Sequence, residues 1–145
     1  MLLIMCSQVC HSSTVQFSIP SNNSTGVTHS LQAGSYNIEY ITGWFNRFGA
    51  SQRYMTRVEV TYDEYSTTLL SSPEFSSVSA IQNYANGSKD HFILSGNKDV
   101  KFWIGNDGNY ADNQGTLTVR LTRNSEPTDL NSTALLTIAE NQPIG

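Results

Sequence analysis

Side chains that carry oxygen are concentrated in residues 107–115, which read DGNYADNQG and contain no Lys or Arg. Hard cations such as calcium take about six to eight oxygen atoms from carboxylates, amides, backbone carbonyls and water. Gly108 and Gly115 allow the tight backbone that wrapping an ion requires. The segment therefore predicts a calcium-binding loop, whose candidate side chains are Asp107, Asn109, Asp112 and Asn113.

The spacing of these residues excludes an EF-hand. Counted from Asp107, that pattern requires Asp or Asn where Ala111 stands, glycine where Asp112 stands and glutamate where Thr118 stands. A plain hairpin turn does fit, because Asp, Asn and Gly crowd turns for conformational reasons alone. Composition by itself therefore leaves a calcium loop and a turn as alternatives.

The segments on both sides of the loop alternate apolar and polar residues. Residues 116–123 read TLTVRLTR, with apolar residues at odd positions only, and residues 100–104 place Val100, Phe102 and Ile104 on one face. A period of two predicts strands with one buried face. The loop is thus expected to join two strands.

Other alternating runs predict strands at 15–19, 36–42 and 56–62, and a further strand begins near 92–94. In the third run we expect Arg57 and Glu59 to be surface charges. Residues 75–84 have a spacing that fits a helix or a loop equally well. With turn signals between the strands and no long helix, the sequence predicts one all-β domain over 14–123, an antiparallel β-sandwich or jelly roll.

An aromatic loop between two glycines, residues 43–49, follows the second strand. Aromatic rings fill cores and also stack on sugar faces. The parity that buries Tyr40 also predicts a buried Trp44. Phe45 and Phe48 are then candidates for the rim of a ligand site.

Residues 105–119, with 33–38 and the pair Gly43-Trp44, resemble the Pseudomonas-type (PA-I-like) galactophilic lectin family. That family has Asn-Asp, then Tyr-x-(Asn/Asp)-Asn-x-Gly, then an alternating strand. The resemblance implies a galactose-binding-domain-like β-sandwich that binds calcium, which in turn coordinates two sugar hydroxyls. It also implies a ligand set: side chains of Asp107, Asp112 and Asn113, and backbone carbonyls of Asn109 and of about Phe48.

The sequence departs from this family in three ways. The loop is two residues shorter between the first aspartate and the tyrosine, and the aromatic residue after Gly-Trp comes one residue later, at Phe48. The family's sugar-contacting His-Pro-x-Gln segment has no counterpart between Gly49 and Ser95. The resemblance to the family therefore supports calcium binding more strongly than it supports binding of galactose.

Composition and motifs exclude several other functions. The chain has 145 residues, 8 Lys and Arg against 12 Asp and Glu, and a net charge of −4, which leaves no basic footprint for nucleic acid. No stretch has the roughly twenty apolar residues that span a bilayer. No catalytic motif is present, and His11, His29 and His91 are scattered and expected to be exposed. We therefore expect a binding protein rather than an enzyme.

The two ends lie outside the expected sandwich. Residues 1–13 are either the remnant of a signal peptide or an unrelated start, and Cys6 and Cys10 there are too few for a zinc site. Residues 124–145 contain a β-prone run at 134–139, which adds a strand either to its own sandwich or to a neighbouring subunit.

Two functional hypotheses follow. The first is an extracellular or cell-surface, calcium-dependent module that binds a carbohydrate, with galactose-type sugars as the family's ligand. The second is a structural subunit in which calcium only stabilises the loop and the tail mediates assembly into a homo-oligomer.

Overall fold

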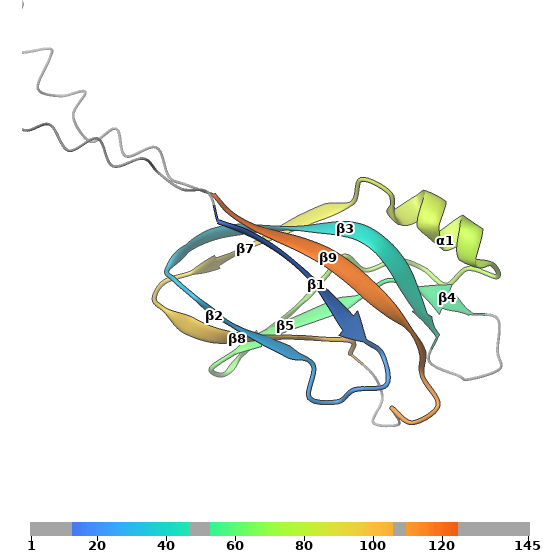
Figure 1. Cartoon of the computed structure of the whole chain (residues 1–145), viewed down its shortest axis with the longest axis horizontal. Helices are drawn as coiled ribbons and strands as arrows, with labels where there is room; N and C mark the ends of the chain where they lie inside the picture. Colours follow the sequence, from blue (N-terminus) through green and yellow to red (C-terminus); the bar gives the residue numbers. More distant parts are fainter. Residues whose placement is uncertain (1–12, 47–52, 106–109, 125–145) are drawn as a thin grey trace, which may run out of the picture.

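A computed structural model describes residues 13–46, 53–105 and 110–124 and shows two antiparallel sheets packed face to face, a β-sandwich (Figure 1). The fold class expected from the alternating segments is confirmed. The first sheet contains β1 (Thr14–Pro20), β3 (Gly34–Asn46), β4 (Tyr54–Met55), β7 (Lys89–Leu94) and β9 (Gln114–Asn124). The second contains β2 (Val27–Leu31), β5 (Val58–Tyr62), β6 (Tyr65–Leu69) and β8 (Lys98–Trp103).

Strand β3 organises the five-stranded sheet. The order is β1-β9-β3-β4, and β7 pairs with the first half of β3 on the side away from β9. The second sheet runs β2-β8-β5-β6. Strands β8 and β9 therefore lie in opposite sheets. The segment between them in the sequence contains the predicted calcium loop.

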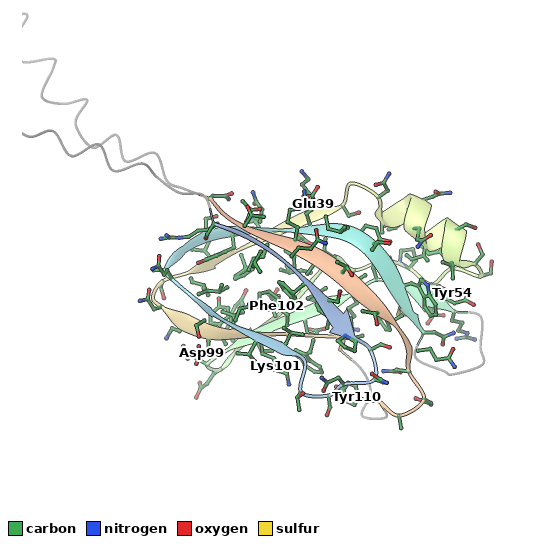
Figure 2. All side chains as sticks on the ribbon, in the orientation of Figure 1. Glu39, Tyr54, Asp99, Lys101, Phe102 and Tyr110 are labelled. Carbon is green, nitrogen blue, oxygen red and sulfur yellow. The ribbon has the colours of Figure 1, made fainter. Side chains whose placement is uncertain are left out.

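The core lies between the sheets and uses the residues that the period of two predicted. Leu117, Val119 and Leu121 of β9 face Val100 and Phe102 of β8, and all are buried. Figure 2 shows Phe102 in the middle of the sandwich. Full burial of each such side chain contributes about 1.5–3 kcal/mol, so alternation along these strands is the main source of stability.

One helix, α1 (Val78–Ala85), lies beside β3 and β4 at one end of the five-stranded sheet (Figure 1). Ser77 caps it, since its Oγ accepts a hydrogen bond from the backbone N–H of Ala80 at 3.3 Å. Ile81 and Ala85 are buried beneath it. The structure thus decides for a helix where the sequence left helix and loop open. Among the described residues, no helix has the length and apolar character needed to cross a membrane.

The aromatic residues of β3 face the opposite way from the sequence prediction. Tyr40 pairs with Val119, but Thr42 pairs with Thr118, so an extra residue interrupts the register at Ile41. Such a bulge reverses the face on which all later side chains lie. Phe45 is consequently 0% exposed, whereas Trp44 is only half-buried. The rim position expected for Phe45 and the burial expected for Trp44 are both wrong.

The reversed orientation of Trp44 and Phe45 can be tested by comparing the stability of two variants. We expect Phe45→Ala to lower the free energy of unfolding by about 3–5 kcal/mol, because it leaves a cavity in the core. Trp44→Ala should cost less, since Trp44 is only partly buried on the outer face of the sheet and its loss leaves no cavity in the core. Guanidinium denaturation of both variants checks this, and a larger loss for Trp44→Ala would contradict the bulged register.

His29 is the histidine whose environment the sequence did not predict. Its ring lies on the inner face of β2, 4.4 Å from the ring of Phe17, and its Nε2 is buried with no hydrogen-bond partner among the described residues. This burial lowers the pKa of His29 from its ordinary value of 6.5, because the charged form loses hydration. The expectation of an exposed His29 is therefore wrong.

A histidine with a lowered pKa in the folded state makes stability depend on pH. The unfolded chain binds the proton more tightly, so stability should fall as the pH drops below about 6.5. His29→Phe should remove this part of the pH dependence, whereas the exposed His91→Phe should retain it. Thermal denaturation of both variants at a series of pH values tests this; equal profiles would contradict it.

Candidate functional site

The structure describes three of the six residues predicted to bind metal or ligand. Asp107, Asn109 and Phe48 lie outside the described residues. Asp112 and Asn113 lie directly before β9, and Phe45 lies in β3. Asp112 is exposed, Asn113 is buried and Phe45 belongs to the core. The two candidates that stand next to each other in sequence therefore have different environments.

Asn113 anchors the end of the loop. Its side chain is only 5% exposed, and its Nδ2 donates a hydrogen bond of 2.9 Å to the backbone oxygen of Ser21. Its backbone N–H donates to the oxygen of Tyr110 at 3.2 Å, which closes a turn. Because the amide nitrogen points to Ser21, the amide oxygen points away from that carbonyl. A buried amide held in this way cannot rotate freely.

Ser21, directly after β1, is hydrogen-bonded to the start of β9, a role that the sequence did not predict. Its N–H and its Oγ both donate to the backbone oxygen of Gly115, at 3.1 Å and 2.9 Å. The side chain is fully buried, so these bonds are shielded from water. Its position directly after Pro20, where the first strand was expected to end, is the only sequence signal for it.

Asn46 is the other buried amide at this end. It is the last residue of β3, is 2% exposed and pairs with Gln114. Buried polar groups are costly unless they are hydrogen-bonded, so three of them at one joint indicate a site under structural constraint. Ser21, Asn46 and Asn113 together hold the start of β9 between β1 and β3.

Gly115 is required at this joint for two reasons. Its φ is +98°, and a Cβ built on it would lie 2.3 Å from the backbone oxygen of Trp44. The ring of Trp44 lies over this glycine and packs edge-on against Tyr54, with centroids 4.9 Å apart. The glycine that the sequence analysis assigned to loop flexibility therefore also permits close packing between β3 and β9.

On the other side of the loop, Glu59 is buried beside Gly105. A Cβ built on Gly105 would lie 2.6 Å from Cγ of Glu59. The carboxylate accepts hydrogen bonds from Nε of Arg57 at 2.7 Å and from the hydroxyl of Thr68 at 2.8 Å. The expectation that Glu59 is a surface charge is wrong, because Gly105 and these neighbours cover it. The buried carboxylate of Glu59, paired with Arg57, thus lies against Gly105, which follows β8 at the start of the loop.

A half-buried aromatic pair lies near the loop. The rings of Trp103 and Tyr110 are 6.4 Å apart, and Nζ of Lys101 lies 4.9 Å from the Trp103 ring. Lys101 also donates to the backbone oxygen of Ser24 at 2.9 Å. Figure 2 shows Lys101 and Tyr110 along the same side of the sandwich. Aromatic faces with polar groups beside them suit ligands that have both apolar and hydroxyl surfaces.

The chemistry of the described donors fits calcium. Asp112 offers an exposed carboxylate and Asn113 an amide whose orientation is fixed by Ser21. Both supply oxygen, which hard cations prefer. Among the described residues, no group of three His, Cys, Asp or Glu could hold a metal ion. A complete ligand set would therefore require Asp107 and the carbonyl groups that the family resemblance implies.

Comparison with solved structures supports the family resemblance at the level of the fold. The chain is similar to the N-terminal domain of EclA, a PllA-like lectin, with a TM-score of 0.51 and 13% sequence identity over 75% of this chain and 95% of that chain. The fold is that of a PllA-like lectin domain. The expectation of a PA-I-like lectin fold is thereby confirmed. That neighbour is named as a lectin.

The sequence itself matches no protein-family model and no curated protein. At 13% identity the structural likeness concerns the backbone arrangement, not individual side chains. The site residues therefore depend on their own geometry.

The joint can be tested with two glycine variants. Gly115→Ala should unfold the protein or destabilise it by several kcal/mol, because the new Cβ would meet the backbone of Trp44 in addition to the strain of a positive φ. Gly87→Ala is the matched control: its φ is +78° and a Cβ there would meet nothing within 4 Å. It should cost only about 1–2 kcal/mol. Equal losses of melting temperature would contradict the proposed packing at Gly115.

Proposed function

We propose that this chain is a calcium-dependent carbohydrate-binding module of the lectin type. The observation that carries the proposal is the PllA-like lectin fold with an oxygen-rich segment at the point where β9 begins. The structural neighbour is named as a lectin, and the segment lies where this chain's resemblance to the PA-I-like family places calcium. The fold and the chemistry of the oxygen donors thus support the same function.

The proposed metal ligands are the side chains of Asp107, Asp112 and Asn113, with backbone carbonyls of Asn109 and of about Phe48. Calcium would supply flexible coordination positions that two neighbouring sugar hydroxyls can occupy instead of water. Among the described residues, Asn113 would fix the position of the loop and Asp112 would give the ion access to a carboxylate. Asn113 is held by the oxygen of Ser21, so the turn into β9 is rigid, and Asp112 presents its carboxylate to solvent.

Trp44, rather than Phe45, is the aromatic residue proposed to contact the sugar. Phe45 is part of the core, whereas Trp44 is half-buried, lies over Gly115 and packs against Tyr54. The ring is thus supported from two sides near the proposed metal loop. Stacking of a sugar face on such a ring adds affinity and orientation. Phe48 stays a predicted ligand contact outside the described residues.

The proposed ligand is a carbohydrate with neighbouring hydroxyls, without commitment to galactose. The family's His-Pro-x-Gln segment is absent from this sequence, so its galactose contacts have no equivalent residues here. A carbohydrate-binding role accords with an extracellular or cell-surface location. Assembly through residues 125–145, the alternative function, stays a prediction because that tail lies outside the described residues.

Replacing one exposed ligand tests the proposal. Asp112→Ala should weaken calcium binding by at least about tenfold, the cost of losing even an outer-shell partner. The calcium-dependent part of sugar binding should disappear with it and should disappear equally in EDTA. Stability in the absence of calcium should change by no more than about 0.5 kcal/mol, since the side chain is exposed.

Isothermal titration with calcium, followed by a glycan array run with calcium and with EDTA, provides the measurement. Asp99→Ala is the matched control, because this aspartate is also exposed but bonds to Ser30 on β2. The proposal is wrong if Asp112→Ala and EDTA both leave glycan binding unchanged, or if Asp99→Ala has the same effect as Asp112→Ala.

A further inference from the structure

A cleft of about 380 Å³ opens between the C-terminal end of α1 and the segment that follows β6. It is lined by Thr56, Leu70, Ser71, Tyr84, Ser88, Lys89 and Asp90. None of these residues belongs to the loop at 105–113, so the cleft is separate from the proposed calcium site. Small-molecule sites have volumes of about 300–1,000 Å³, and this cleft is large enough for a small ligand.

An exposed aromatic face forms one wall. Tyr84 is 53% exposed although it belongs to a helix that packs on the sheet. Its ring lies 5.2 Å from that of Phe75, and two backbone hydrogen bonds of 2.8 Å tie Phe75 to Tyr54. The ring of Tyr84 is therefore supported by a neighbour that the strand pairing holds in place. A supported ring with a free face can accept the apolar face of a ligand.

The opposite wall is a backbone segment held in a strained conformation. Leu70 has a φ of +51°, which a residue with a branched side chain rarely adopts. Its N–H donates to Oδ2 of Asp90 at 3.0 Å, and its carbonyl accepts from the hydroxyl of Thr56 at 2.8 Å. Strained backbone that neighbours hold in place is concentrated at ligand-binding sites. The cleft is thus preformed rather than a gap between loose side chains.

The residues that line this space carry polar groups available to a ligand. The hydroxyls of Ser71, Ser88 and Tyr84, and the carboxylate oxygen of Asp90 that does not accept from Leu70, make no hydrogen bond to another described residue. They include both donors and acceptors. Lys89 is already engaged, because its Nζ lies 3.3 Å from a carboxylate oxygen of Glu39. The cleft therefore offers several neutral donors, one anionic acceptor and no uncommitted cation.

This combination selects the class of ligand. An anion would meet the carboxylate of Asp90 with Lys89 already paired, and a metal ion would find one carboxylate only. A purely apolar ligand would bury hydroxyls without partners, which is costly. A neutral ligand with an apolar face and several hydroxyls satisfies both walls. We infer that the cleft formed by Tyr84, Ser88, Asp90 and Leu70 is a second, calcium-independent site for a pyranose sugar.

This inference goes beyond the proposed calcium site and does not depend on it. With both sites present, one chain binds two sugar units, one through the metal loop and one through the cleft. Two linked sites raise the avidity for a branched or repeating glycan without any oligomer. A single chain could then attach to a glycan surface more firmly than either site alone.

The experiment is an NMR titration of the full chain in EDTA with galactose, glucose, mannose and N-acetylglucosamine in turn. At least one sugar should shift the backbone amide signals of Ser71, Tyr84 and Ser88. Tyr84→Ala should weaken this binding by about tenfold, whereas Tyr84→Phe, which retains the ring, should weaken it by about threefold. Tyr65→Ala, an equally exposed tyrosine on β6 at 50% exposure, should have no effect.

The outcomes separate the two proposals. If none of the four sugars shifts these signals in EDTA, or if the shifts persist unchanged in Tyr84→Ala, the cleft is not a sugar site, whatever calcium does. If the shifts appear and Tyr84→Ala weakens them as expected while calcium and Asp112→Ala change nothing, the cleft stands and the calcium-dependent function fails. Unfolding curves of Tyr84→Ala that match the wild type exclude loss of the fold as the cause.

Discussion

Strands β3 and β9 form the long antiparallel ladder at the centre of the five-stranded sheet, with β1 beyond β9 and with β4 and β7 beyond β3. Their pairing runs from Ser35 with Asn124 to Asn46 with Gln114. It aligns the inner face of the sheet with the core and brings the end of β3 to the start of β9. Both the packing of the sandwich and the position of the candidate loop follow from this one ladder.

The end of the ladder is unusually polar for a buried region. Ser21, Asn46 and Asn113 are all buried there. Asn113 donates a hydrogen bond to the backbone oxygen of Ser21, and the hydroxyl of Ser21 donates one to the backbone oxygen of Gly115. Such a network holds a single geometry more strictly than apolar contacts do. A fixed geometry at this point would hold Asn113 in a defined position within the proposed calcium loop.

The same principle applies to the cleft beside α1, although its construction differs. Asp90 and Thr56 hold the strained backbone of Leu70, and Phe75 supports the ring of Tyr84. In both places, hydrogen bonds and ring contacts from neighbouring residues hold the residues proposed to contact a ligand. The two proposed binding surfaces thus lie at separate places in one small domain, one at a strand junction and the other beside the helix at the end of the sheet.

The sequence alone was sufficient to predict the fold class, and it singled out the segment before β9 as the candidate site. Alternation at 116–123 and 100–104 follows from a local rule, because successive side chains of a strand face opposite sides. The concentration of Asp, Asn and Gly at 107–115 is likewise visible without coordinates, and its likeness to the PA-I-like lectins agreed with the fold.

Only the tertiary structure decided which aromatic residues face solvent and which polar residues are buried. The bulge at Ile41 reverses Trp44 and Phe45, and it arises from the pairing of β3 with a distant strand rather than from local sequence. The burial of Ser21, Glu59 and Asn113 depends on neighbours far away in the chain, as does the cleft that joins Tyr84 to Leu70. Contacts between segments that are distant in sequence have no periodic signature, so no local pattern could have predicted them.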